Sequence, residues 1–345
     1  MVTAPALDIE DLRIRFRTAT SIVESVSGVN LSIAPGKVLG LVGESGCGKS
    51  SLANAVMRLH DERYTRIDGA IRINGQDVLT MAPKALQKLR GGEVAMVFQD
   101  PLNTLNPVLT IGAQLIEAIR DNPRRPVPGE RDKALELLKA TGITSPERRL
   151  TQYPYELSGG MRQRVVIAIA LARNPKLLIA DEPTTALDVT IQAEILDLIK
   201  QLTAERQMAV LFITHDLGVI SHMADRVAVM YLGEIVEQAD TAELFRNPLH
   251  PYTRRLLRAA PSMSTPKDQR LVTVPGRVPS LTDIPDACRF ANRCSFSEIR
   301  CTTEAPKLIE SVPGHAARCW RQDELRAGTL REAEIAGEAM SGALS

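Results

Sequence analysis

The stretch Gly43-Glu44-Ser45-Gly46-Cys47-Gly48-Lys49-Ser50-Ser51 decides the fold of this chain. Its first eight residues follow the pattern G-x-x-x-x-G-K-S of a phosphate-binding loop. An apolar run, residues 37–42, precedes the loop, and a helix-like segment, Ser51 to Leu59, follows it. A glycine-rich turn that ends in Lys-Ser by chance would not need this strand–loop–helix context. The sequence therefore predicts a phosphate site at residues 43–51.

Each residue type in this loop has a chemical reason. Gly43, Gly46 and Gly48 allow the backbone to curl, so that the N–H groups of the loop point at phosphate oxygens. The helix that follows adds the positive end of its dipole. Lys49 can reach the β- and γ-phosphates, and the hydroxyl of Ser50 can bind Mg²⁺. Cys47 is interpreted as a small filler of the loop.

The composition sets limits on where the chain works. Its 345 residues carry a net charge of +1, which argues against nucleic-acid binding by bulk charge, so no nucleic-acid partner is expected. The longest strongly apolar run, residues 165–172, is far shorter than the roughly 20 residues that cross a bilayer. Residues 1–9 lack the basic start and apolar core of a signal peptide. We expect a cytoplasmic chain that only partners could hold at a membrane.

Short apolar strands alternate with helical patterns after the loop, which predicts an α/β fold with a largely parallel sheet covered on both faces. A strand with alternating polarity at Leu7–Arg17 and a hairpin at Gly69–Val78, with Asn74-Gly75 at its turn, predict an antiparallel part. Helical spacing over residues 110–141, broken by a loop at residues 122–129, predicts a helical part. The other expected strands are residues 29–33, 94–98, 177–180 and 209–214, and a helix is expected at residues 190–204.

Two carboxylates follow the apolar strand at residues 177–180. A parallel strand delivers its last side chains to the sheet edge where a phosphate loop also lies. Asp181 would hold Mg²⁺, and Glu182 would polarise the attacking water as general base. A solvated acidic turn is the alternative, but four apolar residues directly before the pair argue against it.

The segment Leu157-Ser158-Gly159-Gly160-Met161-Arg162-Gln163 is the most diagnostic. Ser158 is a good helix N-cap, and the two glycines expose N–H groups where the helix begins, which is a site for an anion. Together with the phosphate loop and the Asp-Glu pair, this segment resembles the signature motif of the ABC ATPases.

The resemblance implies roles for further residues. In ABC ATPases two copies pack head to tail, and the signature residues Ser158, Gly159, Gly160 and Gln163 would act on the ATP of the partner. Gln99 resembles the Q-loop glutamine, which contacts Mg²⁺ and the γ-phosphate. His215 resembles the switch histidine, although taken alone it would more often be an ordinary histidine at a strand end. Asp188, in the segment Ala186-Leu187-Asp188, resembles the D-loop. Phe16 falls where the family carries a tyrosine that stacks on adenine, but it is equally a natural core residue.

Three segments resemble a subfamily, the ATPases of the dipeptide/oligopeptide/nickel importers. They are residues 98–107, His250-Pro251-Tyr252-Thr253 with the leucines that follow, and residues 275–281. The expected organisation is a P-loop ABC-type ATPase domain at residues 1–243, with a helical subdomain at about 100–165. A small cysteine-containing C-terminal extension at residues 244–323 and a flexible tail at residues 324–345 would follow.

Four cysteines, Cys288, Cys294, Cys301 and Cys319, lie within the expected extension. Four thiolates in one short segment suit an iron–sulfur cluster or a tetrahedral Zn²⁺. Their wide spacing, without a C-x2-C pair, favours [4Fe-4S], and the resemblance to dipeptide permease ATPases points the same way; zinc is the second choice. Two disulfides or four unligated thiols are the remaining alternatives. Four nearby arginines, Arg289, Arg293, Arg300 and Arg318, could hydrogen-bond cluster sulfurs or lie in solvent.

The resemblance implies the ATP-binding subunit of a bacterial ABC importer, which hydrolyses MgATP at the cytoplasmic face of the membrane to drive uptake of dipeptides or oligopeptides. The implied partners are a second, different ATPase subunit, two transmembrane permease subunits and an extracytoplasmic solute-binding protein. Import of nickel or another small solute is the alternative within the family. A soluble ABC ATPase, an iron–sulfur-regulated ATPase not coupled to transport, and an ABC exporter are the alternatives from other classes.

Overall fold

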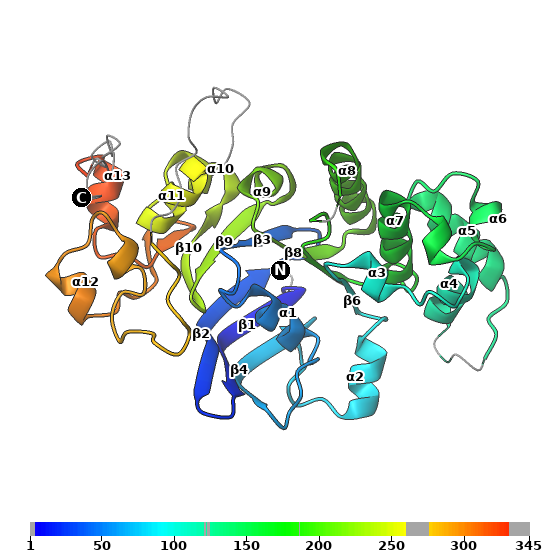
Figure 1. Ribbon diagram of the computed structural model, residues 1–345, viewed down its shortest axis with the longest axis horizontal. Helices are drawn as coiled ribbons and strands as arrows, with labels where there is room; N and C mark the ends of the chain where they lie inside the picture. The colour runs from blue at the N-terminus through cyan, green and yellow to red at the C-terminus, as the bar shows by residue number, and fades with distance from the viewer. Residues whose placement is uncertain (1–3, 121, 123–124, 186, 260–275, 331–345) are drawn as a thin grey trace, which may run out of the picture.

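The strands that carry the predicted sites meet in one mixed sheet of eight strands in the computed structural model (Figure 1). The structure describes residues 4–120, 122, 125–185, 187–259 and 276–330. The strand order is β11-β12-β10-β9-β3-β8-β7-β6, and the five strands from β9 to β6 are parallel. The strands are β3 (Val38–Val42), β6 (Val94–Val97), β7 (Leu177–Asp181), β8 (Ala209–Thr214), β9 (Arg226–Tyr231), β10 (Glu234–Asp240), β11 (Ile309–Val312) and β12 (His315–Ala317). The α/β fold with a parallel-sheet core is confirmed.

A second, antiparallel sheet has the order β2-β1-β4-β5. Its strands are β1 (Leu7–Arg17), β2 (Ile22–Ile33), β4 (Thr65–Ile73) and β5 (Gln76–Asp77). The predicted hairpin is confirmed, because Asn74 and Gly75 connect β4 to β5 with φ angles of 48° and 78°. Strand β2 is longer than predicted: Ser25 and Ser27 interrupt the apolar pattern in the sequence, yet both are buried in the strand.

The parallel strands divide the interior into two cores, because successive side chains point to opposite faces. On β3, Val38 and Val42 pack with the helices of one face, whereas Leu39 and Leu41 pack with the antiparallel sheet and α1 (Lys49–Val56) on the other. Both faces of the strand are therefore apolar, which is why it reads as a continuous hydrophobic run in the sequence.

The predicted helical part lies at the end of the sheet beside β6 and is drawn in cyan and green at the right of Figure 1. It contains α3 (Pro101–Thr104), α4 (Ile111–Ile119), α5 (Glu130–Ala140), α6 (Pro146–Arg149) and α7 (Gly159–Ala170). The other helices before the extension are α2 (Pro83–Leu89), α8 (Val189–Arg206), α9 (Leu217–Met223) and α10 (Thr241–Arg246). Helices α4 and α5 both contact α7. Helix α7 in turn contacts α8 and β6, and so joins the helical part to the main sheet.

The C-terminal extension is built onto the opposite end of the main sheet. Strand β12 pairs with β10 in antiparallel register, and β11 pairs with β12, so the extension continues the sheet of the preceding domain. Its helices are α11 (Pro251–Ala259), α12 (Ile299–Thr303) and α13 (Gln322–Ala327). Leu325 of α13 is buried, so the first residues of the expected tail form a helix, while residues 331–345 lie outside the described residues. No helix within the described ranges is long and apolar enough to cross a membrane.

Candidate nucleotide-binding site

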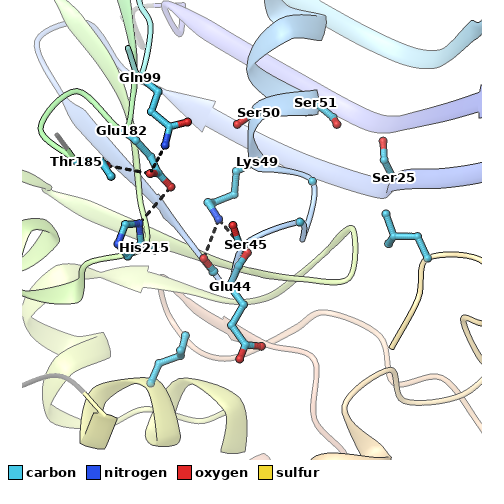
Figure 2. Close-up of a pocket in the computed structure, with 15 residues that line it drawn as sticks. Ser25, Glu44, Ser45, Lys49, Ser50, Ser51, Gln99, Glu182, Thr185 and His215 are labelled. Carbon is cyan, nitrogen blue, oxygen red and sulfur yellow. Dashed lines mark hydrogen bonds and ion pairs between the residues drawn. The ribbon is translucent and has the colours of Figure 1, made fainter. Parts of the chain in front are cut away.

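A cleft of about 710 Å³ opens where the phosphate-binding loop leaves β3 (Figure 2). This volume lies in the range of small-molecule sites. Most residues predicted to contact ATP or its attacking water line this one cleft. Its lining residues are Ser25, Gly43, Glu44, Ser45, Gly46, Gly48, Lys49, Ser50, Ser51, Gln99, Glu182, Thr185, His215, Leu256 and Leu281. Sequence reasoning did not assign Ser25, Thr185, Leu256 or Leu281 to the nucleotide site. Leu256 and Leu281 lie in segments that resemble the subfamily, but only the fold brings them to the cleft.

Two glycines of the loop, Gly43 and Gly48, are required by close backbone contacts. A Cβ atom at Gly43 would lie 2.2 Å from the carbonyl oxygen of Met230. At Gly48, where φ is +109°, a Cβ atom would lie 2.3 Å from the carbonyl oxygen of Ser25. Cys47 is buried beneath the loop, and burial raises the pKa of its thiol, in keeping with a filler. The loop is therefore packed against strands of both sheets.

Lys49 lies in the cleft with its ammonium group directed at the loop. Its Nζ atom donates to the carbonyl oxygens of Gly43, at 2.7 Å, and Glu44, at 3.0 Å. This places a positive charge at the centre of the loop, where the phosphates of a nucleotide would lie. The side chain of Glu44 points away from Lys49 and the cleft centre (Figure 2).

Glu182 lies at the end of β7 and receives three hydrogen bonds in the cleft (Figure 2). Gln99 Nε2 donates to its Oε2 atom at 3.1 Å, Thr185 Oγ1 donates to the same atom at 2.9 Å, and His215 Nδ1 lies 3.2 Å from Oε1. Glu182 has a φ of 48°, an uncommon backbone conformation for a residue other than glycine. The chain therefore departs from the extended conformation of β7 at this residue. The structure thus brings together three residues, Gln99, Glu182 and His215, that are far apart in the sequence.

Asp181 and Ser50 provide a set of oxygen ligands suited to Mg²⁺. Asp181 is 8% exposed, and its Oδ1 atom has no hydrogen-bond partner within the described part of the chain. Burial is the main cause that raises the pKa of this carboxyl, and the charge of Glu182 adds to it; the hydrogen bond with Ser50 and the charge of Lys49 act in the opposite direction. A buried carboxylate oxygen without a partner fits a cation site.

The signature residues do not line this cleft. Ser158 caps α7 and accepts a hydrogen bond from the N–H of Met161 at 3.4 Å, while Gln163 is fully buried within the helix packing. A Cβ atom at Gly160 would lie 2.6 Å from Ile191 of α8, so Gly160 fixes the packing of the two helices. Asp188 caps α8 through the N–H of Ile191 at 3.0 Å. Ala186 of the expected D-loop lies outside the described residues.

Comparison with known proteins identifies the family. A family model for ABC transporters matches residues 26–185, and a model for the oligopeptide/dipeptide transporter C-terminal region matches residues 236–301. A relative from Brucella melitensis biotype 1, named as a peptide import ATP-binding protein, is 48% identical over 317 residues, which are 92% of this chain and 95% of the relative. The chain belongs to the ABC transporter ATPases.

Further comparisons agree with this membership. The ABC transporter ATPase is 47% identical to the Probable peptide ABC transporter ATP-binding protein y4tR of Sinorhizobium fredii, over 92% of this chain and 96% of the relative. A dimeric post-hydrolysis structure of the ATP-binding cassette MJ0796, bound to ADP and Pi, matches 68% of this chain and 98% of that chain at 29% identity, with a TM-score of 0.61. CbiO1 from Clostridium perfringens matches with the same TM-score at 28% identity, over 70% of this chain and 91% of that chain.

Phe16 of this ABC ATPase is not among the described residues that line the cleft. Its ring contacts His60 edge-on, with ring centroids 5.2 Å apart, and it packs against the core beneath the antiparallel sheet. The apolar part of the cleft lining comes instead from Leu256 and Leu281 of the extension. Stacking of Phe16 on adenine stays a prediction.

The four cysteines of the extension line one apolar cavity together with Trp320 and Arg321. All are free thiols, which argues against the two-disulfide alternative. Burial raises the pKa of Cys288 to about 11 and that of Cys319 to about 12. Within the described ranges, no three metal-ligating side chains converge closely enough to hold one metal ion. The cavity thus gathers the four thiols without forming a closed single-ion site.

The arginines considered as cluster partners have other partners in the structure. Arg289 donates to the carbonyl oxygen of Leu232, and Arg318 donates to that of Ile235. Arg300 lies 3.4 Å above the ring of Trp320. Arg293 reaches the phosphate-binding loop. Arg300 is also half exposed to solvent, and hydrogen bonding of these arginines to cluster sulfurs stays a prediction.

Proposed function

We propose that this ABC ATPase is the ATP-binding subunit of an importer that takes up dipeptides or oligopeptides across the cytoplasmic membrane. The observation that carries the proposal is the match over 92% of the chain to relatives named for peptide import, together with the oligopeptide/dipeptide transporter C-terminal region at residues 236–301. Nickel or another small solute is the alternative cargo. The C-terminal region argues against the two other classes considered, a soluble ABC ATPase and an iron–sulfur-regulated ATPase that is not coupled to transport.

The arrangement of the cleft supports a general-base mechanism for ATP hydrolysis. The attacking water would lie between Glu182 and the γ-phosphate, and Glu182 would accept a proton from it as the new P–O bond forms and the bond to the leaving ADP oxygen breaks. His215 and Gln99, which contact the Glu182 carboxylate, would orient it and reach the γ-phosphate. Lys49 would bind the phosphates. Mg²⁺ supplies charge neutralisation on the phosphates when bound, and Ser50, Asp181 and Gln99 would hold it.

We also propose that the chain works at the cytoplasmic face of the membrane with two permease subunits, which receive an extracytoplasmic solute-binding protein on their other side. A second ATPase subunit would complete each ATP site with its signature residues. The separation of Ser158 and Gly160 from the cleft supports this, because these N–H groups cannot act on ATP bound to the same chain. The dimeric state of MJ0796 is consistent with such pairing.

For the cysteine cavity, we propose a [4Fe-4S] cluster with a structural role, and Zn²⁺ as the second choice. Cys288, Cys294, Cys301 and Cys319 line one cavity and would hold the centre through their thiolates, which are suitable ligands for either metal centre. Binding of a metal centre would deprotonate the thiols, and its binding free energy would add to the stability of the folded extension. Iron, sulfide and zinc analysis of anaerobically purified protein tests this, and absence of all three from folded, active protein would contradict it.

The mechanism is tested by Glu182→Gln, which keeps the shape of the side chain but removes the base. We expect ATP to stay bound while steady-state hydrolysis falls by about 10² or more, the usual contribution of a general base. Glu205→Gln, at an exposed position of α8, serves as the control. Unchanged hydrolysis in Glu182→Gln would remove the general-base role. Uptake of labelled dipeptides, oligopeptides and nickel by cells that carry or lack the transporter tests the cargo separately.

A further inference from the structure

A side chain from the cysteine-bearing segment reaches the phosphate-binding loop. Arg293 directly precedes Cys294, and its guanidinium group forms a two-pronged ion pair with the carboxylate of Glu44: Nη1 to Oε2 at 2.6 Å and Nη2 to Oε1 at 3.0 Å. The two residues are 249 positions apart in the sequence. The side chain of Arg293 is only 4% exposed, so water competes little for this pair.

A second residue of the extension holds the same loop residue by its backbone. The hydroxyl of Tyr252, in α11, accepts a hydrogen bond from the N–H of Glu44 at 2.9 Å. Tyr252 is fully buried, and its ring packs with those of Tyr231 and Phe290. Glu44 is therefore fixed by its main chain and its side chain at once, both times from the extension.

Arg293 also contacts residues of two neighbouring elements, β9 and α11. Its guanidinium group lies 3.3 Å from the Tyr231 hydroxyl, and its carbonyl oxygen accepts from Arg255 of α11 at 2.7 Å. The pair thus compensates the negative charge of Glu44, a residue of the phosphate-binding loop, from the extension.

We propose that Arg293 is a positioning residue for the nucleotide: by holding Glu44, it fixes the phosphate-binding loop in its binding shape, so that the cysteine-bearing extension sets the ATP affinity of the site. Lys49 supports this view, because it donates to the carbonyl oxygen of the same residue, Glu44. A loop already held in its bound shape loses less conformational entropy when the phosphates bind. The proposal rests on ATP binding at this cleft and not on the identity of the transported solute.

The test measures ATP and ADP affinity and steady-state kinetics of the full chain with Arg293→Ala and Arg293→Lys. We expect the dissociation constant and KM to rise about tenfold in Arg293→Ala, because the loop loses a partly buried charge pair. Arg293→Lys keeps the charge but not the two-pronged geometry, so its dissociation constant should lie between those of the unaltered protein and Arg293→Ala. The kcat at saturating ATP stays within about twofold, because Arg293 touches no reacting atom. Arg326→Ala, at an exposed position of α13, is the matched control and leaves the affinity unchanged.

Glu44→Gln tests the same contact from the loop side and keeps every side chain of the extension, so a folding defect specific to Arg293→Ala would not decide the outcome. If the two residues act as one unit, the double variant binds ATP no more weakly than Arg293→Ala alone. Additive losses in the double variant, unchanged affinity in both single variants, or a fall in kcat with constant KM would each overturn the proposal. Failure of the unaltered chain to bind ATP would instead remove the site assignment itself.

Discussion

At the scale of single residues, the orientation of the proposed catalytic carboxylate, Glu182, is set by its neighbours more than by its own position. Glu182 is the residue after β7, and a strand end alone would leave its side chain free to rotate. Three donors from three separate segments, Gln99, Thr185 and His215, fix both carboxylate oxygens. A base whose lone pairs are held in place loses less entropy when it takes a proton from the attacking water.

Thr185 provides a test of this arrangement. Thr185→Val keeps the side-chain shape but removes one hydrogen bond to Glu182, which is worth about 1 kcal/mol. We expect kcat to fall about fivefold with little change in the KM for ATP, because Thr185 orients the base without contacting the phosphates. Thr185→Ser retains the hydroxyl and should keep most of the activity. A rise in KM at constant kcat would show that Thr185 serves nucleotide binding instead.

The residues that the sequence predicted for the cleft are those whose chemistry follows from a local pattern. The phosphate loop predicts Lys49 and Ser50 by spacing, and the strand end predicts Asp181 and Glu182. Thr185 follows Glu182 closely, but a threonine in a turn carries no signal of its own. Leu256 and Leu281 could not be predicted, since an apolar residue in a distant segment becomes a cleft wall only when the extension folds back on the loop.

At the scale of elements, one buried carboxylate joins the extension to the main sheet. Glu237 of β10 is fully buried and accepts hydrogen bonds from the N–H groups of Leu249, at 2.6 Å, and His250, at 3.0 Å, at the start of α11. His315 of β12 lies 2.7 Å from the same carboxylate. Burial lowers the pKa of the His250 side chain to about 3, so it stays neutral there. Strand β12 and helix α11 thus share one anchor.

Removing that anchor should loosen the extension before the rest of the protein. Glu237→Ala leaves two backbone N–H groups and His315 without their acceptor, and breaking a buried pair of this kind costs about 3–5 kcal/mol. Trp320 is the single tryptophan of the chain and lies in the cysteine cavity, so its fluorescence reports on the extension during denaturant unfolding. We expect the denaturant midpoint reported by Trp320 fluorescence to be lower in Glu237→Ala than in the unaltered protein. The exposed control, Glu205→Ala, should change stability by no more than about 0.5 kcal/mol.

The elements themselves were predictable to unequal degrees. Strands β3, β7 and β8 are continuous apolar runs because both of their faces are buried, and the sequence identifies them. Strand β12, His315-Ala316-Ala317, has no β-branched or aromatic residue, and three residues are too few to show a period. Its place in the sheet comes from its pairing with β10 and from the His315–Glu237 contact, which are tertiary. Sequence reasoning therefore treated the extension as a separate unit, whereas the sheet runs through both.

At the scale of the whole molecule, the two groups of ATP-related residues lie on different elements of one chain. The cleft is built by the phosphate loop, the strand ends of the parallel sheet and the extension, whereas Ser158 lies exposed where α7 begins, in the helical part. Each bound nucleotide would then need the cleft of one chain and the signature of another. On the proposed pairing, a partner subunit would take part in the chemistry as well as in the assembly.

Mixing two inactive variants tests whether that partner can be a second copy of this chain. Lys49→Ala disables the cleft but keeps the signature, and Ser158→Arg places a bulky charge at the signature but keeps the cleft. Each variant alone should hydrolyse ATP at least about 10² more slowly than the unaltered protein, with nucleotide affinity preserved only in Ser158→Arg. In a mixed pair, one site combines an intact cleft with an intact signature, whereas the other site carries both defects. If the partner is a copy of this chain, random pairing of equal amounts makes about half of the dimers mixed, and each mixed dimer has one whole site of two. Mixing should then restore about a quarter of the unaltered activity. Activity of the mixture equal to the average of the two variants would show that the second ATPase must be a different homologue, as the proposed importer composition requires.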